Sequence, residues 1–422
     1  MCVRRAIITC PDTWGSGQLS TTTQKLRIAA GTLLVSVTFL TIFGLVMLYS
    51  TSVAIHHEQL LVKQSVWIFL GLVLATTLCR VDYRKLGVYS KWLLLLVSLP
   101  LVYLATAHLL YRCGFHDVTK LPCVASINGA FRWLRVGSFT LQPSEFAKPA
   151  IILFLAHYYG TNPRSVLTLA KGVWRPMLVV GVVVVLVLLG GSLSVTMITG
   201  MVVMVIMFIV GIRLRYLLLP ILAGLILFGA AIAVSPERVS RLTDFLDPEA
   251  TRYDGGYQLW CSQLALGSGY WTGVGFNESL MKERYLPESH TDFIMAIVGE
   301  ELGFVTVAIV MLMYLLVLGA ALTVSTHALD REGMLLAAGI GVSIGLHALV
   351  HIAVVSGAAP TTGITAPLIS YGGSSMLATW AGIGLLVNVI RTTMANPETD
   401  EESVRPRSPS FLAKDTKPVL QP

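Results

Sequence analysis

The chain has 422 residues, of which 55% are hydrophobic and only 13% are charged. This composition excludes an ordinary soluble globular protein, in which about a quarter of the residues are charged. The formal net charge of +7 does not indicate a nucleic-acid-binding surface, because the basic residues are scattered over short segments between apolar runs.

Apolar runs of roughly 18–25 residues predict an all-α integral membrane protein with about ten membrane-spanning helices. The fifth and sixth runs are nearly continuous, so we expect either a tight turn or a single long helix there. The eighth exceeds one bilayer crossing, which predicts a tilted helix or one that extends outside the membrane. The expected spans are 28–49, 62–79, 92–110, 145–160, 176–191, 193–212, 216–235, 292–325, 333–356 and 372–393.

Lysine and arginine residues predict the orientation of these spans. They precede the first span, follow the second, fourth and sixth, and recur in the C-terminal tail. All of these segments lie on one side if the number of spans is even, so both termini are expected in the cytoplasm. Residues 1–24 then form a cytoplasmic tail, too polar for a signal peptide, 25–393 the ten-span domain, and 394–422 a disordered cytoplasmic tail.

Two segments are expected on the outer side. Residues 111–143 contain the amphipathic sequence FRWLR at 131–135, which is expected to lie in the membrane interface or to dip inward. Cys113 and Cys123 in the same segment form either a disulfide, if the outside is oxidising, or two free thiols. Residues 236–291 form the largest external loop. A third irregular segment precedes the last span, where Pro360, Gly363 and Pro367 predict a broken or re-entrant stretch beside protein or a water-filled cavity.

Ionisable residues at the edges of or inside apolar spans are costly and usually face a cavity or a partner. Asp292 stands at the expected outer start of the eighth span, where it is either an acid favoured by the helix dipole or a general base. Glu300 and Glu301 follow two turns later. Glu300 is a candidate to bind substrate. Alternatively, one of the two acids faces a cation or pairs with a basic residue such as Arg132 or Lys148, while the other is packed and hydrogen-bonded.

The fourth span begins with Glu145 and Lys148, three residues apart on one helix face. They form either a local ion pair or a site in which Lys148 binds a phosphate group and Glu145 orients it. Arg132, beside Trp133, either binds an anionic group or extends toward the membrane interface.

The sequence SYGGSS at 370–375 can present backbone N–H groups and hydroxyls to an anion at a helix start, or can simply break the helix. The candidate residues here are Ser370, Gly372, Gly373, Ser374 and Ser375. No P-loop, GxSxG, HExxH or Cys/His metal spacing occurs, so ATPase, serine hydrolase and zinc protease functions have no support.

These stretches together resemble the SEDS family (shape, elongation, division and sporulation proteins), and its division members more than its elongation members. The matching sequences, in the family's order, are NGA at 128–130 with Arg132-Trp133, QPSEFAK at 142–148, FLDP at 245–248, YQ at 257–258, ALGSG at 265–269, YLPE at 285–288, HTDF at 290–293, GEELGF at 299–304 and PLISYGGSS at 367–375. The chain departs from the family at 190–194, which reads GGSLS and lacks the usual acid, and at 358–360, which reads AAP.

The resemblance implies a ten-span enzyme of the bacterial cytoplasmic membrane that polymerises lipid II into glycan strands during septal wall synthesis. It would act with a class B penicillin-binding protein, an FtsI-like transpeptidase, and with other division proteins. The family's essential external acid corresponds to Asp292. Its basic and polar cavity residues correspond to Arg132, Glu145, Lys148 and residues 370–375. A divalent cation, Mg²⁺ or Mn²⁺, is a further expectation. The alternatives are a lipid II flippase and a non-catalytic division scaffold.

Overall fold

The structure is a computed structural model, which describes residues 13–54, 59–115, 122–127, 130–137 and 139–395. Most of the two expected tails, and the Asn128-Gly129 pair of the family resemblance, therefore lie outside the described residues. Residues 13–24, expected as tail, form the first turns of helix α1. The long helices are α1 (Thr13–Ala54), α2 (Gln59–Arg80), α4 (Ser90–Arg112), α5 (Pro143–Thr161), α6 (Arg175–Leu189), α7 (Leu193–Ile209), α8 (Leu214–Ala233), α11 (Ile294–Thr326), α12 (Arg331–Val355) and α13 (Gly373–Ala395).

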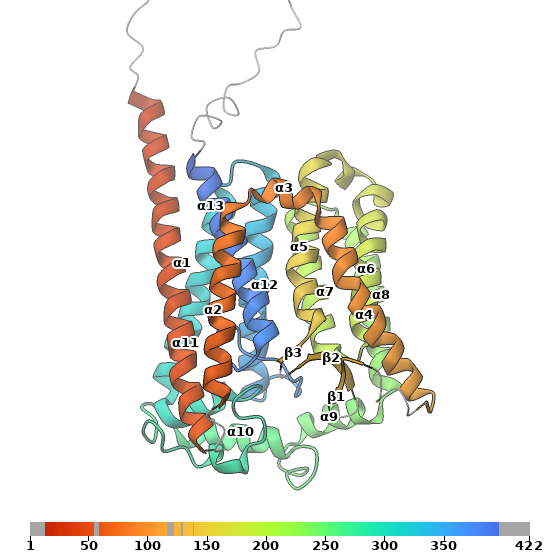
Figure 1. Cartoon of the computed structure of the whole chain (residues 1–422), viewed down its shortest axis with the longest axis vertical. Helices are drawn as coiled ribbons and strands as arrows, with labels where there is room; N and C mark the ends of the chain where they lie inside the picture. Colours follow the sequence, from red (N-terminus) through yellow and green to blue (C-terminus); the bar gives the residue numbers. More distant parts are fainter. Residues whose placement is uncertain (1–12, 55–58, 116–121, 128–129, 138, 396–422) are drawn as a thin grey trace, which may run out of the picture.

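These helices coincide with the predicted spans and run side by side along the bundle (Figure 1). Among the described residues, eight segments are long and apolar enough to cross a membrane. The other two predicted spans correspond to α5, whose 19 residues include Glu145 and Lys148, and to α7, which has 17 residues. The predicted helical membrane fold is confirmed, whereas the exact count of ten crossings stays a prediction.

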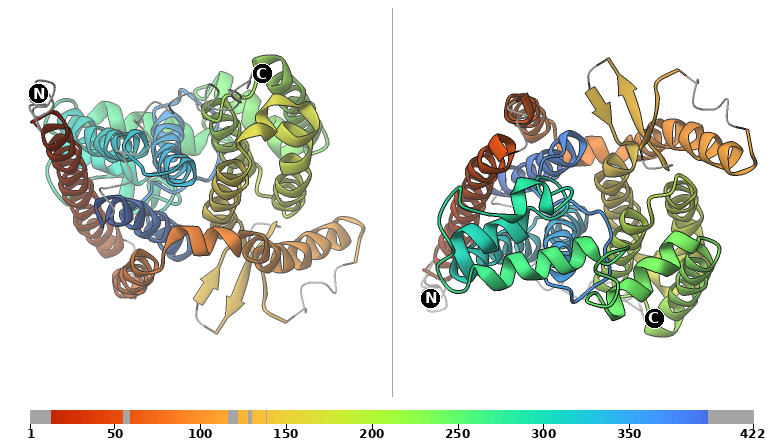
Figure 2. Two further views of the ribbon diagram at one scale, coloured as in Figure 1. Left: turned by 90° about the horizontal axis from the view of Figure 1, so that it is seen from above. Right: turned by 90° about the horizontal axis from the view of Figure 1, so that it is seen from below.

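The bundle has two parts that meet through α5 and α12. Helices α1, α2, α11, α12 and α13 lie on one side, and α4 to α8 on the other (Figures 1 and 2). Helix α12 contacts α11 and α13 in its own part and α5 and α7 in the other. The most buried apolar window is that of α13, at 72%, and the least buried is that of α8, at 6%. The outer faces of helices such as α8 are therefore suited to contact with lipid chains.

The first segment that was expected on the outer side forms a small antiparallel sheet of β1 (Val124–Ile127), β2 (Ala130–Val136) and β3 (Phe139–Leu141), with β2 in the middle. Leu134 of β2 stands opposite Val124 of β1 and Leu141 of β3. Phe131 is fully buried and packs with Ala107 and Tyr111 of α4. The expected interfacial piece at 131–135 is thus a paired strand anchored to α4, because its alternating side chains suit a strand once two neighbours supply backbone partners.

The loop before α11, which was expected on the outer side, is partly helical. It contains α9 (Pro236–Leu246), α10 (Tyr257–Ser268) and the short turn η4 (Met281–Tyr285). The sheet, α9 and α10 lie together at the end of the bundle opposite to the start of α1 and the end of α13 (Figure 1). The end of the bundle with the start of α1 carries the short elements α3 (Tyr83–Val88), η2 (Pro163–Leu167) and η3 (Ala170–Trp174).

Three irregular points interrupt the helices, and the break within α11 was not predicted. A tight turn separates α6 from α7, so the alternative of one continuous helix is wrong. The segment between α12 and α13 contains no helix, as its proline and glycine residues predict. Helix α11 is interrupted at Gly303, whose φ of 74° only glycine adopts easily. There the backbone N–H groups of Val274 and Gly275 donate to the carbonyls of Glu300 and Glu301 at 2.9 and 3.0 Å.

The two cysteines of the segment before α5, Cys113 and Cys123, are separate free thiols.

Candidate active site

A cavity of about 680 Å³ lies at the end of the bundle that carries the sheet and α9. It is bounded by the ends of α2 and α4, the sheet, the start of α9, the segment before α11 and the broken segment before α13. Its described lining includes Lys63, Trp67, His108, Arg112, Arg132, Trp133, Glu145, Glu237, Arg238, Arg241, Glu288, His290, Asp292, Gly363, Thr365 and residues 371–375. It therefore combines several basic side chains with a few acids.

Asp292 faces this cavity from the turn immediately before α11. Burial is the main cause that raises the pKa of its carboxyl to about 7, and the nearby charge of Glu288 raises it further, while Arg132 and Arg241 act in the opposite direction. The broken segment approaches closely, since a Cβ on Gly363, whose φ is 65°, would stand 3.4 Å from Asp292 Oδ2. A carboxylate that titrates near neutral pH in a cavity suits a general base.

The broken segment holds the turn that carries Asp292. The Ser370 hydroxyl donates to the carbonyl of Thr291 at 2.6 Å and accepts from the backbone N–H of Ala366 at 2.8 Å. The backbone N–H of Tyr371 donates to the carbonyl of His290 at 3.0 Å. Ser370 itself is buried and is absent from the described lining. It is thus placed to position the turn, not to contact a ligand.

The other residues of the SYGGSS sequence do reach the cavity. Gly372, Gly373, Ser374 and Ser375 all belong to its lining. The Ser374 hydroxyl accepts from the backbone N–H of Gln142 at 2.8 Å, which joins the start of α13 to the start of α5. The predicted grouping of these four residues around a polar space is therefore seen in the structure, while their role in binding stays a prediction.

Lys148 is held by protein groups. Its ammonium donates to Glu145 Oε2 at 2.8 Å and lies 3.1 Å from His347 Nδ1. Glu145 and Lys148 are 5% and 6% exposed. Lys148 lines a separate void of about 30 Å³, whereas Glu145 and His347 border both spaces. The local ion pair is thus the arrangement found, and the structure does not bring Lys148 into the large cavity as a phosphate ligand.

Glu300 and Glu301 also lie away from the cavity lining. Glu300 accepts from the backbone N–H of Leu280 at 3.1 Å and from the hydroxyl of Ser279. Glu301 is fully buried and forms an ion pair with Lys282 at 2.8 Å. Neither acid pairs with Arg132 or Lys148, the basic partners named from the sequence. The structure thus places both acids in the contact between the external loop and α11, and it does not support Glu300 as a substrate ligand.

The cavity contains arginines that the sequence interpretation did not select. Arg112 ends α4, and Arg238 and Arg241 belong to α9, whereas Arg132 of β2 was predicted. Burial and the charges of Arg241 and Arg238 lower the pKa of the Arg132 guanidinium. These residues are far apart in the sequence, so no local motif joins them.

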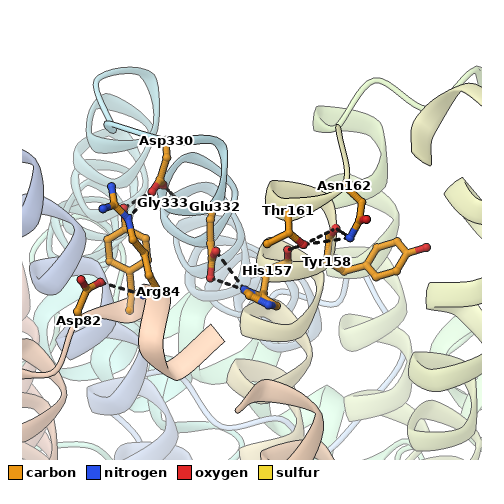
Figure 3. Close-up of polar contacts among 10 residues, drawn as sticks. Asp82, Arg84, His157, Tyr158, Thr161, Asn162, Asp330, Glu332 and Gly333 are labelled. Carbon is orange, nitrogen blue, oxygen red and sulfur yellow. Dashed lines mark hydrogen bonds and ion pairs between the residues drawn. The ribbon is translucent and has the colours of Figure 1, made fainter. Parts of the chain in front are cut away.

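A second polar cluster lies at the opposite end of the bundle (Figure 3). Arg84 Nε is 2.6 Å from Asp330 Oδ2, and the Tyr83 hydroxyl donates to Asp330 Oδ1 at 2.9 Å. His157 Nδ1 lies 3.1 Å from Glu332 Oε1. These contacts tie α3 and α5 to the start of α12, and each member already has a protein partner. The cluster is therefore best explained as a structural connection between the two parts of the bundle.

Within the described residues, no three His, Cys, Asp or Glu side chains are grouped as a metal site. The acids of the cavity are accompanied by arginines, which disfavour a cation. The donor set does not fit a resident Mg²⁺ or Mn²⁺, and no chemical step is assigned to one.

Comparison with known proteins identifies the class to which this fold and cavity belong. Residues 31–395 match the family model for FtsW, RodA and SpoVE, described as "Cell cycle protein", and the chain belongs to this family. A Geobacter sp. (strain M18) protein named "Probable peptidoglycan glycosyltransferase FtsW" is 35% identical over 357 residues, which cover 83% of this chain and 93% of that protein. The predicted family is confirmed.

Solved structures agree with this assignment. A chain from "Structural coordination of polymerization and crosslinking by a peptidoglycan synthase complex" is 29% identical, with a TM-score of 0.66, over 86% of this chain and 97% of that one. The Rod shape determining protein RodA of Thermus thermophilus is 27% identical, with a TM-score of 0.59, over 85% of this chain and 95% of that one.

Proposed function

We propose that this protein is a peptidoglycan glycosyltransferase that polymerises lipid II at the outer face of the cytoplasmic membrane. The observation that carries this proposal is Asp292, a carboxyl whose pKa is raised to about 7, in a cavity of about 680 Å³ lined by arginines. Family membership and the names of the curated relatives support the same activity.

The reaction joins two lipid-linked sugars. The 4-hydroxyl oxygen of an acceptor forms a bond to the anomeric carbon of a donor, and the bond from that carbon to the diphosphate oxygen breaks with its electron pair. The hydroxyl proton passes to a carboxylate oxygen of Asp292, which must be ionised to receive it. A single displacement inverts the anomeric configuration, so an α-linked donor yields a β-linked strand.

Charge develops on the departing diphosphate as this bond breaks. Arg132 lines the cavity and is one of the two arginines that lower the pKa of Asp292. A preorganised donor at a developing negative charge contributes on the order of 3 kcal/mol to lowering the barrier. We assign this role to Arg132. Lys148 has no such role in this proposal, because its ammonium contacts Glu145 and His347 within the protein.

The surroundings of the cavity suit a substrate with a membrane-bound tail. The cavity lies at the external ends of long apolar helices, so a prenyl chain can remain among lipids while the sugars react above them. We propose a class B penicillin-binding protein as the partner that crosslinks the strands, other division proteins as further partners, and the division septum as the location. A cavity at the outer face of the membrane requires both termini to lie in the cytoplasm. A divalent cation that arrives with the diphosphate is a further proposal.

A flippase remains the competing function, because the charged group of Glu145, Lys148 and His347 lies inside the bundle. The test uses purified protein with its transpeptidase partner and labelled lipid II, in detergent, without ATP or a membrane gradient. We expect a glycan polymer, which flipping cannot produce. The absence of polymer would contradict the proposal, and polymer formed by the partner alone would favour a scaffold.

A further inference from the structure

Three segments place arginines at one end of the cavity. Arg112 is the last residue of α4, Arg238 and Arg241 lie on α9, and Arg132 lies in β2. His108, one turn before Arg112, borders the same space. Four guanidinium groups from distant parts of the chain thus line the same cavity.

The positive charge of this surface is not balanced by ion pairs. Arg112 donates to the Ser235 hydroxyl at 2.9 Å, and Arg238 donates to the carbonyl of Ala231 at 2.8 Å, both neutral acceptors. Arg132 Nε is buried without a hydrogen-bond partner. In the described part of the chain, none of the four arginines forms an ion pair. The charge of Glu237 favours the charged form of both Arg132 and Arg238, and that of Asp292 favours the charged form of Arg132.

Unbalanced arginines of this kind indicate an anionic ligand. Burial and then mutual repulsion lower the pKa values of Arg132 and Arg238, so holding these charges side by side costs free energy. An anion that enters the cluster removes this repulsion. Arginine presents two parallel N–H donors to a phosphate group, and several arginines together match the charge of two linked phosphates better than that of one.

The arginines are not equally close to Asp292. Arg132 and Arg241 lower the pKa of its carboxyl, whereas Arg112 together with Arg241 lowers the pKa of Arg238. The cluster therefore extends from Asp292 toward the α4 end of the cavity. In an inverting displacement the attacking oxygen and the leaving group lie on opposite sides of the reacting carbon. A base at one end and a cluster of cations at the other fit that geometry.

We propose that Arg112, Arg238 and Arg241 form the subsite for the prenyl-linked diphosphate of the donor, with Arg241 and the neighbouring Arg132 on the side of this subsite that faces Asp292. This inference rests on the proposed function, because it assigns one substrate group within the same cavity. The diphosphate stays bound there as the glycosidic bond forms and leaves on its lipid carrier afterwards. The acceptor sugar then occupies the part of the cavity beside Trp67 and residues 371–375.

Direct binding tests this assignment. The full chain is placed in nanodiscs of phosphatidylcholine, and labelled undecaprenyl diphosphate is titrated in competition with undecaprenyl monophosphate. We expect the diphosphate to bind more tightly, and Arg238→Gln or Arg241→Gln to weaken it by about tenfold or more, as expected for a lost charged hydrogen bond. Arg238→Lys, which keeps the charge but not the paired donors, is expected to lie between wild type and Arg238→Gln.

Arg252→Gln is the matched control. Arg252 belongs to the same external loop but stacks on Tyr253 at 4.9 Å and does not line the cavity. We expect it to bind the diphosphate lipid like wild type. Equal binding by wild type and both glutamine variants would overturn the inference. Equal loss of diphosphate, monophosphate and phosphatidylglycerol binding would also overturn it, because the cluster would then bind any anionic headgroup.

Asp292→Asn separates this inference from the proposed function. We expect it to bind the diphosphate lipid while it makes no polymer. If wild-type protein makes no polymer yet binds the diphosphate through its arginines, the subsite stands and the proposed function fails. If polymer forms normally in Arg238→Gln and Arg241→Gln proteins, the subsite is wrong and the function stands.

Discussion

Lys282 offers the sharpest test of how the external loop is held against the bundle. Its ammonium donates to Asn277 Oδ1 at 2.6 Å, to Glu301 Oε1 at 2.8 Å and to the Ser50 hydroxyl at 3.0 Å. Lys282 is 2% exposed and Glu301 is 0% exposed. The contact joins the loop that leads to Asp292 with both α1 and α11.

Lys282→Met is expected to destabilise the protein because it leaves the carboxylate of Glu301 buried without a counter-charge. Breaking one side of a buried ion pair costs about 3–5 kcal/mol. The double change Lys282→Met with Glu301→Gln removes both charges and keeps an acceptor for Ser50. It should therefore recover most of that loss. Polymer formation should fall with the single change and largely return with the double change.

Thermal unfolding in detergent measures these effects, alongside polymer yield at a temperature where all variants are folded. Lys85→Met, at an exposed lysine of α3, is the control and should match wild type. The reasoning is refuted if Lys282→Met unfolds at the wild-type temperature. It is refuted equally if the double variant is no more stable than Lys282→Met alone, since the cost would then not come from the isolated carboxylate.

Further predictions concern the titration of the site, the buried ion pair and the orientation of the chain. Burial raises the pKa of Asp292 to about 7, and only its ionised form accepts a proton. We therefore expect kcat/KM for polymerisation to rise between about pH 6 and about pH 8. A value of kcat/KM that does not change over this range would contradict the assignment. Lys148→Ala should destabilise the protein by about 3–5 kcal/mol, since it leaves Glu145 unpaired, and truncation of both residues should partly restore stability to thermal unfolding; no restoration would argue against a structural pair. A single cysteine at position 268, in a background without native thiols, should be labelled from outside intact cells, whereas one at position 410 should not; the reverse pattern would place Asp292 on the cytoplasmic side.

The helical bundle was predictable from the sequence because each span is an apolar run of sufficient length, which is a local property. Asp292 could be found for a related reason, since its position between a polar loop and an apolar run is visible along the chain. The pair of Glu145 and Lys148 follows from helical spacing. The contact of Lys148 with His347 does not, because His347 comes from α12, which lies far away in the sequence.

The features that escaped prediction all depend on contacts between distant segments. The alternation in FRWLR suits a strand, but its role becomes clear only when β1 and β3 pair with it. Glu301 finds its counter-charge in Lys282, which a turn of the external loop brings back onto α11. Arg112 and Arg238 share a cavity because the start of α9 meets the end of α4, where Arg112 donates to the Ser235 hydroxyl. The local sequence pattern does not predict contacts between segments that are distant along the chain.

The central claim is that Asp292 accepts the proton in a polymerisation reaction. Its most direct test compares wild-type and Asp292→Asn protein, each purified with the transpeptidase partner, for polymer formed from labelled lipid II. Asparagine has nearly the same shape but cannot take up the proton. We predict polymer from the wild type and none from Asp292→Asn, with equal unfolding temperatures or a slightly higher one for the variant, because a buried charge is removed. Normal polymer yield from folded Asp292→Asn protein would contradict the claim.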